Sequence, residues 1–119
     1  MAPTGKIDDR VVLEPAERRL IGRYGRLVGS RARLTESEKI HALHARFEDP
    51  SSRRALIHHY LPLSYRLARR IRKGSLLRRI EAGNRAVIEC IDRDFLRPED
   101  DMDYQVARRI REAIRAAIA

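Results

Sequence analysis

A chain of 119 residues with 43% hydrophobic and 36% charged residues can bury one modest core under a charged surface, and it is too short for a barrel enzyme or two full lobes. Its single cysteine, Cys90, excludes a disulfide framework and a cysteine-based zinc site. The formal net charge of +9 favours a polyanion or an acidic protein surface as the partner.

Residues 1–33 are predicted to form an amino-terminal arm with one short helix. Pro15 suits the first turn of a helix, where its missing N–H costs nothing. Gly22 and Gly25 weaken this helix, and Gly29 ends it. Its apolar side is expected to carry Leu20, Tyr24, Leu27 and Val28.

A second helix is predicted over residues 34–48. Thr35 and Glu38 have the spacing of a capping box, in which each side chain bonds the other residue's backbone N–H. The core side of this helix is expected to carry Ile40, Leu43, His44 and Phe47. Asp49 and Pro50 then end it and begin the next helix as N-cap and first residue.

The third helix is predicted over residues 50–72, and Pro62 inside it should bend it near His58 or split it. Gly74 ends this helix and Ser75 can cap another. The apolar stripe of the third helix consists of Leu56, Tyr60, Leu63, Leu67 and Ile71.

A fourth helix is predicted over residues 75–94, followed by an acidic loop over 92–103 and a last helix over 102–118. Gly83 lies on the apolar side of the fourth helix and permits close approach of a neighbour. The fourth helix carries Leu76, Leu77, Ile80, Val87, Ile88 and Ile91, and the last carries Val106, Ile110, Ala113 and Ala117, flanked by Ile114. The predicted fold is a compact all-α bundle of four or five helices.

Positive charge is concentrated in the middle of the chain. Residues 53–85 contain ten basic residues and one acid, Glu81. Their charge balance of +9 equals the formal net charge of the whole chain. On the last helix, helical spacing places an aromatic and three arginines on one ridge opposite the core: Tyr104, Arg108, Arg111 and Arg115. Such a ridge suits phosphate contact with one ring for stacking, and a solvated arginine face is the alternative.

Several short segments occur in a distinctive order: LTESE at 34–38, HYLPL at 59–63, RLARRI at 66–71, RRIEAGN at 78–84, IDR at 91–93 and IREAI at 110–114. In this order and spacing, residues 34–119 resemble the second conserved region of the bacterial primary sigma factor family. HYLPL and RLARRI resemble its first core helix, RRIEAGN stands where the family has DLIQEGN, IDR is similar to VDK, IREAI to IRQAI, and LTESE to the LTxxE that begins the preceding helix.

This resemblance implies a transcription regulator that docks on bacterial RNA polymerase core and on promoter DNA. The expected polymerase-binding residues are Arg78, Glu81, Asn84, Arg85 and Ile88. The expected DNA-binding residues are Tyr104, Gln105, Arg108, Arg109, Arg111, Arg115, Arg69 and Arg70. Because the chain stops where the family continues into domains that read upstream DNA, we expect a separate DNA-binding co-activator. Split activators of phage-like and gene-transfer-agent clusters offer an analogy.

Departures from the family lie at its DNA-contacting positions. The Trp pair falls on Arg108 and Arg109, the base-capturing Tyr falls on Gln105, and the preceding aromatic and basic run falls on residues 100–104, which include three Asp. Two alternatives therefore stay open. One is a sigma mimic that acts as a decoy or inhibitor of polymerase or of an anti-sigma factor. The other is a plain helical DNA-binding or interaction module.

An enzyme is not expected. His41 and His44 lie three residues apart, and His58 and His59 are adjacent, but no third ligand completes a metal site at a recognisable spacing. His44 is predicted to be a packed group because it lies on the core side of its helix. Cys90 is also predicted to be a packed group, since no general base is identifiable beside the thiol. We expect no metal, cofactor or small-molecule substrate. No apolar run approaches the roughly 18 residues of a membrane span, so we expect a cytoplasmic, nucleoid-associated protein with no membrane partner.

Overall fold

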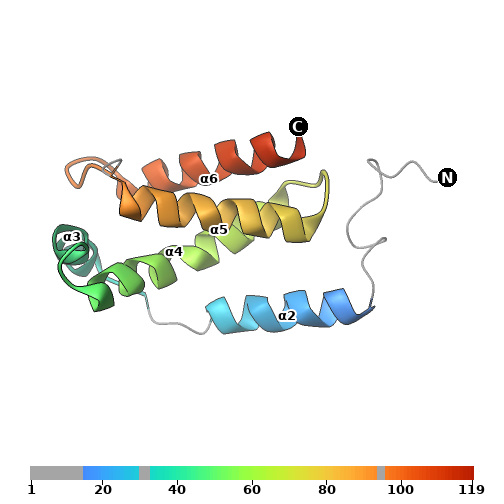
Figure 1. Ribbon diagram of the computed structural model, residues 1–119, viewed down its shortest axis with the longest axis horizontal. Coiled ribbons are helices and arrows are strands. Elements are labelled where there is room, and N and C mark those ends of the chain that lie inside the picture. Colours follow the sequence, from blue (N-terminus) through green and yellow to red (C-terminus); the bar gives the residue numbers. More distant parts are fainter. Residues whose placement is uncertain (1–14, 30–32, 94–95) are drawn as a thin grey trace.

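The computed structural model describes residues 15–29, 33–93 and 96–119, and these ranges contain helices and connecting turns with no strand (Figure 1). The all-α prediction is confirmed. Residues 1–14 of the predicted arm lie outside the described residues, as do the side chains of Leu20 and Val28. The helices are α2 (Pro15–Gly29), α3 (Glu36–Ala45), α4 (Pro50–Arg70), α5 (Leu76–Asp92) and α6 (Met102–Ile118).

Side-chain caps fix where these helices begin. Thr35 and Glu38 form the predicted capping box, with bonds of 3.2 Å from Glu38 N to Thr35 Oγ1 and 2.8 Å from Thr35 N to Glu38 Oε1. Asp49 and Ser75 cap α4 and α5, also as predicted. Asp101 caps α6 by accepting a 3.1 Å bond from Tyr104 N. Each cap satisfies a backbone donor that the first helical turn leaves unpaired, which is worth about 1 kcal/mol.

The core lies where α4, α5 and α6 run side by side, with α5 packed against both of the others (Figure 1). α3 and α2 pack on α4. Burying an aliphatic side chain fully contributes about 1.5–3 kcal/mol, so these positions supply most of the stability. The fully buried apolar side chains include Leu56, Tyr60, Val87, Ile91, Val106, Ile110 and Ile114.

Two glycines allow close helix contacts. A Cβ on Gly83 would lie 2.4 Å from Ser64 Oγ, so its absence lets α5 approach α4 as predicted. A Cβ on Gly25 would lie 2.6 Å from the hydroxyl of Tyr65. Gly25, expected only to weaken its helix, therefore also lets α2 dock on α4.

Several predicted core positions are wrong. α3 ends at Ala45, so Phe47 lies past its last turn and is 67% exposed. Arg46 takes the inward position instead, donating from Nε to the Ile91 carbonyl over 2.6 Å. His44 is exposed as well, and it is not the packed group that its spacing indicated.

Three further differences concern the other helices. On α2, Leu27 is 55% exposed and Ile21 is buried, because the side of the helix that meets α4 includes Ile21. α4 is one continuous helix across Pro62, so of the two predicted outcomes, a bend or a split, the split does not occur. On α6 the buried stripe includes Ile114 at 0% exposure, while Ala113 and Ala117 are only partly buried.

No described helix combines the length and the apolar character that crossing a membrane requires.

Candidate functional site

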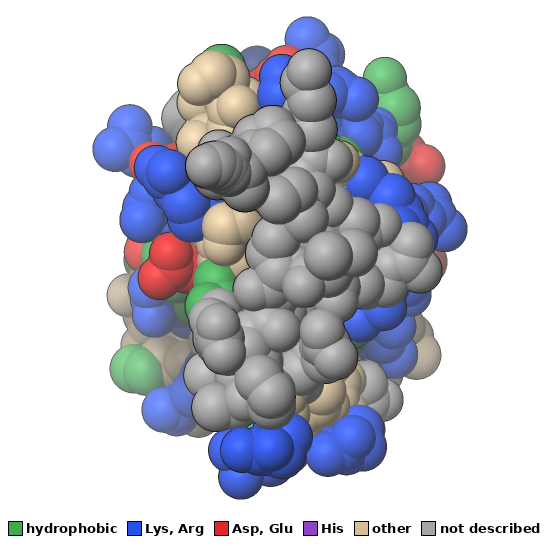
Figure 2. All heavy atoms as spheres, turned by 90° about the vertical axis from the view of Figure 1, so that its right-hand side faces the viewer, with side chains coloured by type: hydrophobic (Ala, Val, Ile, Leu, Met, Phe, Trp, Pro, Cys, Tyr) green, Lys and Arg blue, Asp and Glu red, His purple; other side chains and the backbone are tan. Residues whose placement is uncertain are grey.

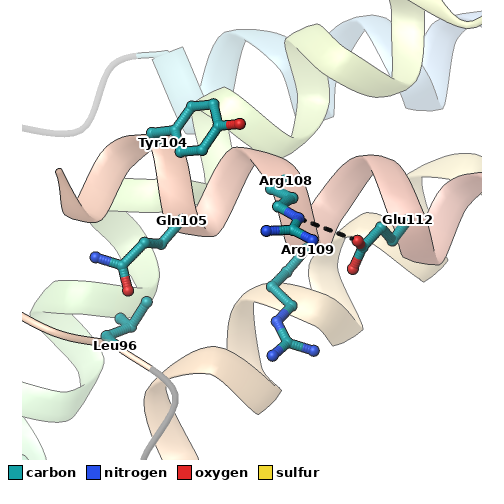
Figure 3. Close-up of a pocket in the computed structure, with 6 residues that line it drawn as sticks. All are labelled: Leu96, Tyr104, Gln105, Arg108, Arg109 and Glu112. Carbon is teal, nitrogen blue, oxygen red and sulfur yellow. Dashed lines mark hydrogen bonds and ion pairs between the residues drawn. The ribbon is translucent and has the colours of Figure 1, made fainter. Parts of the chain in front are cut away.

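A hollow of about 310 Å³ lies beside the first half of α6 (Figure 3). Tyr104 is 59% exposed at this site. Arg108 and Arg109 are also exposed, so an aromatic ring and two cationic side chains lie together at this site. The hollow is lined by Leu96, Tyr104, Gln105, Arg108, Arg109 and Glu112.

Gln105 holds the loop that forms one wall of this hollow. Its Nε2 donates to the Arg97 carbonyl over 2.9 Å, and its Oε1 accepts from Arg97 N over 3.0 Å. These two bonds fix the segment that carries the buried Leu96 against α6. Both polar atoms of the carboxamide are therefore engaged by the backbone, and Gln105 shapes the site by positioning the loop.

The arginines of α6 differ in their surroundings. Arg108 Nε lies 3.3 Å from Glu112 Oε2, and both side chains are more than half exposed. Arg109 also lines a second hollow of about 240 Å³ between α5 and α6, which is lined in addition by Ala86, Glu89, Cys90, Glu112 and Ala113. The two hollows share Arg109 and Glu112, so they adjoin along α6.

Cys90 in the second hollow is buried at 1% exposure, which confirms the prediction of a packed group. Burial raises the pKa of its thiol to about 11, and the charge of Arg109 lowers it by less. The thiol is therefore protonated near pH 7, a state in which it is neither a good nucleophile nor a metal ligand.

Two of the three aspartates in and just before the first turn of α6 have structural partners. Asp101 is the N-cap of α6. Asp103 Oδ1 accepts from Lys39 Nζ over 2.9 Å and from the Tyr60 hydroxyl over 2.8 Å. Burial alone would raise the pKa of Asp103, but the hydrogen bonds from Lys39 and Tyr60 outweigh it, so its pKa is lowered. The carboxylate of Asp103 is thus ionised, and Lys39 offsets part of its charge near the α6 ridge.

The outer side of α5 carries four of the five expected polymerase-binding residues. Arg78, Glu81, Arg85 and Ile88 are all exposed, with Ile88 at 39%, and their spacing places them on one side of the helix. We call these four residues the α5 face. Its mixture of an exposed aliphatic group with charges of both signs is suited to contact with a protein surface.

Asn84, the fifth expected residue, lies at a helix junction. Its Oδ1 accepts from Ser64 Oγ of α4 over 3.0 Å, and its Nδ2 donates to the Tyr24 hydroxyl of α2 over 2.8 Å. Tyr24 in turn packs against Tyr65 with ring centroids 5.8 Å apart. Asn84 therefore joins three helices instead of lying with the α5 face.

The expected DNA-binding residues fall in two places. Tyr104, Arg108, Arg111 and Arg115 follow one side of α6, and we call them the α6 ridge. Arg69 and Arg70 lie in the last turn of α4, at the end of the molecule away from the start of α6 (Figure 1). Arg69 donates to the Tyr65 hydroxyl over 3.1 Å, and both arginines are exposed.

Sequence reasoning missed the structural role of Arg79, which it counted among the basic residues of 53–85. Arg79 is 2% exposed and donates to the carbonyls of Ala68, Lys73 and Gly74 over 2.7–2.8 Å. The available signal was its position on the apolar stripe of α5, just after a helix end whose carbonyls need donors. Arg53 is likewise engaged, with Asp92, over 2.6 and 2.8 Å.

His59 is buried and uses its Nδ1 to accept a 3.0 Å hydrogen bond from Leu34 N. Within the described ranges, no three His, Cys, Asp or Glu side chains come together as a metal site would require.

Comparison of the chain with protein-family models and with curated proteins finds no match.

Proposed function

We propose that this chain is a transcription regulator that docks on bacterial RNA polymerase core and on promoter DNA, and that it activates transcription together with a separate DNA-binding partner. The proposal rests on the resemblance of residues 34–119 to the second conserved region of primary sigma factors. A net charge of +9 agrees with a nucleic-acid partner.

The observation that carries the proposal is the pairing of two different surfaces on two helices that pack against each other. The α5 face offers Ile88 among charges, which is chemistry suited to a protein partner. The α6 ridge offers one ring and three arginines, which is chemistry suited to phosphates and bases. Because α5 and α6 pack directly on each other, one chain can bind both partners in a fixed relative orientation.

The polymerase half of the proposal is tested by quantitative pull-down of core polymerase. The variant Arg78→Asp/Arg85→Asp reverses two charges on the α5 face, and we expect its affinity to fall at least tenfold, or by about 1.4 kcal/mol. The matched control, Arg54→Asp/Arg93→Asp, reverses two exposed charges away from this face and should bind within twofold of the wild type.

Thermal unfolding of both variants checks that the fold is intact. If the wild type does not associate with core polymerase, alone or with a candidate co-activator, the proposal is wrong. Equal losses in the two variants would show that net charge, and not the α5 face, governs the interaction.

The decoy or inhibitor reading is favoured by one feature of the α6 ridge. Tyr104 is its single ring, and Arg108 lies 3.3 Å from the carboxylate of Glu112. Fewer rings leave less stacking to stabilise opened DNA strands. Run-off transcription separates the two functions: an activator with its partner raises output from a particular set of promoters, whereas a decoy lowers output from ordinary promoters.

A further inference from the structure

A group of cations surrounds the turn that joins α4 to α5. The chain has no acidic residue between positions 51 and 80. Figure 2 looks at the molecule from this end, where many Lys and Arg side chains and a few Asp and Glu side chains are visible. We use the name basic corner for five exposed side chains: Arg69, Arg70, Arg72, Lys73 and Arg78.

The backbone of the basic corner is held in place from inside. Buried Arg79 donates to the carbonyls of Ala68, Lys73 and Gly74, which spans the turn from one helix to the other. Gly74 adopts a φ of 73°, and a Cβ on it would lie 2.8 Å from Cγ2 of Ile118. The turn is therefore fixed against the end of α6, and a preorganised site loses less entropy when it binds.

The basic corner has one neighbouring aromatic ring, and that ring is already engaged. Residues 66–94 contain no Phe, Tyr or Trp. The preceding ring, Tyr65, lies beside Arg69, whose Cζ is 5.7 Å from the ring centroid, and it also packs against Tyr24 and the Gly25 backbone. Sites for single-stranded nucleic acid combine cations with rings on which bases stack. Cations without rings are suited to the phosphates of a duplex, whose bases are already stacked on each other.

We propose that the basic corner binds the phosphate backbone of duplex DNA without regard to sequence. The inference rests on the proposed function, since it names the form of DNA held at this end of the molecule. The amino end of α5, capped by Ser75, adds the positive end of its helix dipole to the same site.

The distance between the α6 ridge and the basic corner can be compared with a length of duplex DNA. Tyr104 lies near the start of α6 and Ile118 at its end, beside the basic corner. A helix rises about 1.5 Å per residue, so roughly 21 Å separates them along α6. At about 3.4 Å per base pair this distance corresponds to some 6 base pairs. Duplex held at the corner would therefore lie about half a helical turn from any base that meets Tyr104.

The test measures DNA binding without polymerase, by fluorescence anisotropy on a 20-base-pair duplex and on a single strand of the same length. The variant Arg70→Gln/Lys73→Gln removes two charges from the corner. The matched control Arg54→Gln/Arg93→Gln removes two exposed charges from the other end. Arg70→Lys keeps the charge and should bind like the wild type.

We expect the wild type to prefer the duplex, and we expect the corner variant to lose at least tenfold in affinity at low salt. Its slope of log affinity against log salt should fall by about 1.8, because two phosphate contacts are lost. The control should keep the wild-type slope. Equal losses in the two variants, tighter binding to the single strand, or no duplex binding at low salt would each overturn the proposal. Since no polymerase is present, failure here is separate from failure of the proposed function.

Discussion

At the scale of single residues, Arg79 shows how a cation can serve the fold instead of a ligand. Its guanidinium lies at 2% exposure and reaches three carbonyls at the end of α4 and in the turn after it. Its neighbour Arg78 is exposed on the α5 face. Adjacent residues of the same type thus have different surroundings, because the helix turns one of them inward.

Replacing Arg79 by Met should therefore destabilise the protein by about 2–3 kcal/mol, since buried carbonyls lose their donors. Arg78→Met removes the same group from the surface and should change stability by less than about 0.5 kcal/mol. Urea unfolding measures both. Similar stability for the two variants would contradict the role assigned to Arg79.

His59 gives a pH dependence whose sign is fixed by its surroundings. Burial lowers its pKa below the ordinary value of 6.5, the charge of Lys39 lowers it further, and the charge of Asp103 raises it by less. Its Nδ1 must also be unprotonated to accept from Leu34 N. The unfolded state takes up the proton more readily than the folded state. The contribution of His59 to the free energy of unfolding is therefore fully present above pH 6.5 and is lost as the pH falls through the lower folded pKa.

We expect the wild-type Tm to fall between about pH 7 and pH 5 and the profile of His59→Asn to be flatter. Asn places Oδ1 near the position of Nδ1 but does not titrate. The remaining histidines are common to both proteins, so the difference between the profiles reports on His59. Parallel profiles would show that His59 does not couple folding to pH.

At the scale of elements, the close contact of α4 with α5 depends on Gly83. Ala has the higher helix propensity by about 1 kcal/mol, yet its Cβ would lie 2.4 Å from Ser64 Oγ. Ser64 is fully buried and bonded to Asn84, so it cannot move away without losing that bond. The steric cost therefore outweighs the gain in propensity.

Gly83→Ala should destabilise the protein by about 1–3 kcal/mol. Ser64→Ala removes the clashing oxygen, so the double variant should be more stable than the sum of the two single effects predicts. A double-mutant cycle in urea measures this coupling. Strict additivity would mean that the cost of Gly83→Ala does not arise from contact with Ser64 Oγ.

Local signals made the helix boundaries predictable. Asp49 with Pro50, Ser75 and the capping box of Thr35 each act within one turn, so their effect can be inferred from neighbouring residues alone. Phe47 was misplaced because the residue that turns inward beside it, Arg46, bonds to the carbonyl of Ile91, 45 positions along the chain. Such a partner is not visible in a local pattern.

In the candidate site, too, some features could be predicted from local sequence and others could not. Helical period predicted the α5 face and the α6 ridge, since their members share one side of a helix. It did not predict that Asn84 bonds to Tyr24, 60 positions away, or that Gln105 holds the Arg97 backbone. Both depend on how separate segments pack, which sequence periodicity does not determine.

At the scale of the whole molecule, the two ends differ in how their cations are balanced. The turn from α4 to α5 carries the basic corner, while at the opposite end carboxylates accompany the cations: Lys39 pairs with Glu36 and Asp103, and Arg53 pairs with Asp92. A molecule with this polarity approaches a polyanion with its basic end first. Arg78 belongs to both the α5 face and the basic corner, whereas Glu81, Arg85 and Ile88 follow it along α5, so the proposed protein contact and the proposed DNA contact can be made side by side.

We proposed that the chain docks on RNA polymerase core as its resemblance to sigma factors implies, and competition with a sigma factor for core enzyme tests this most directly. Labelled chain is bound to core polymerase, unlabelled primary sigma factor is added in increasing amounts, and the bound label is measured by anisotropy. Our account predicts that the label is displaced completely, in proportion to the sigma factor bound. Binding of the sigma factor with no loss of label, or no binding of the chain to begin with, would contradict it.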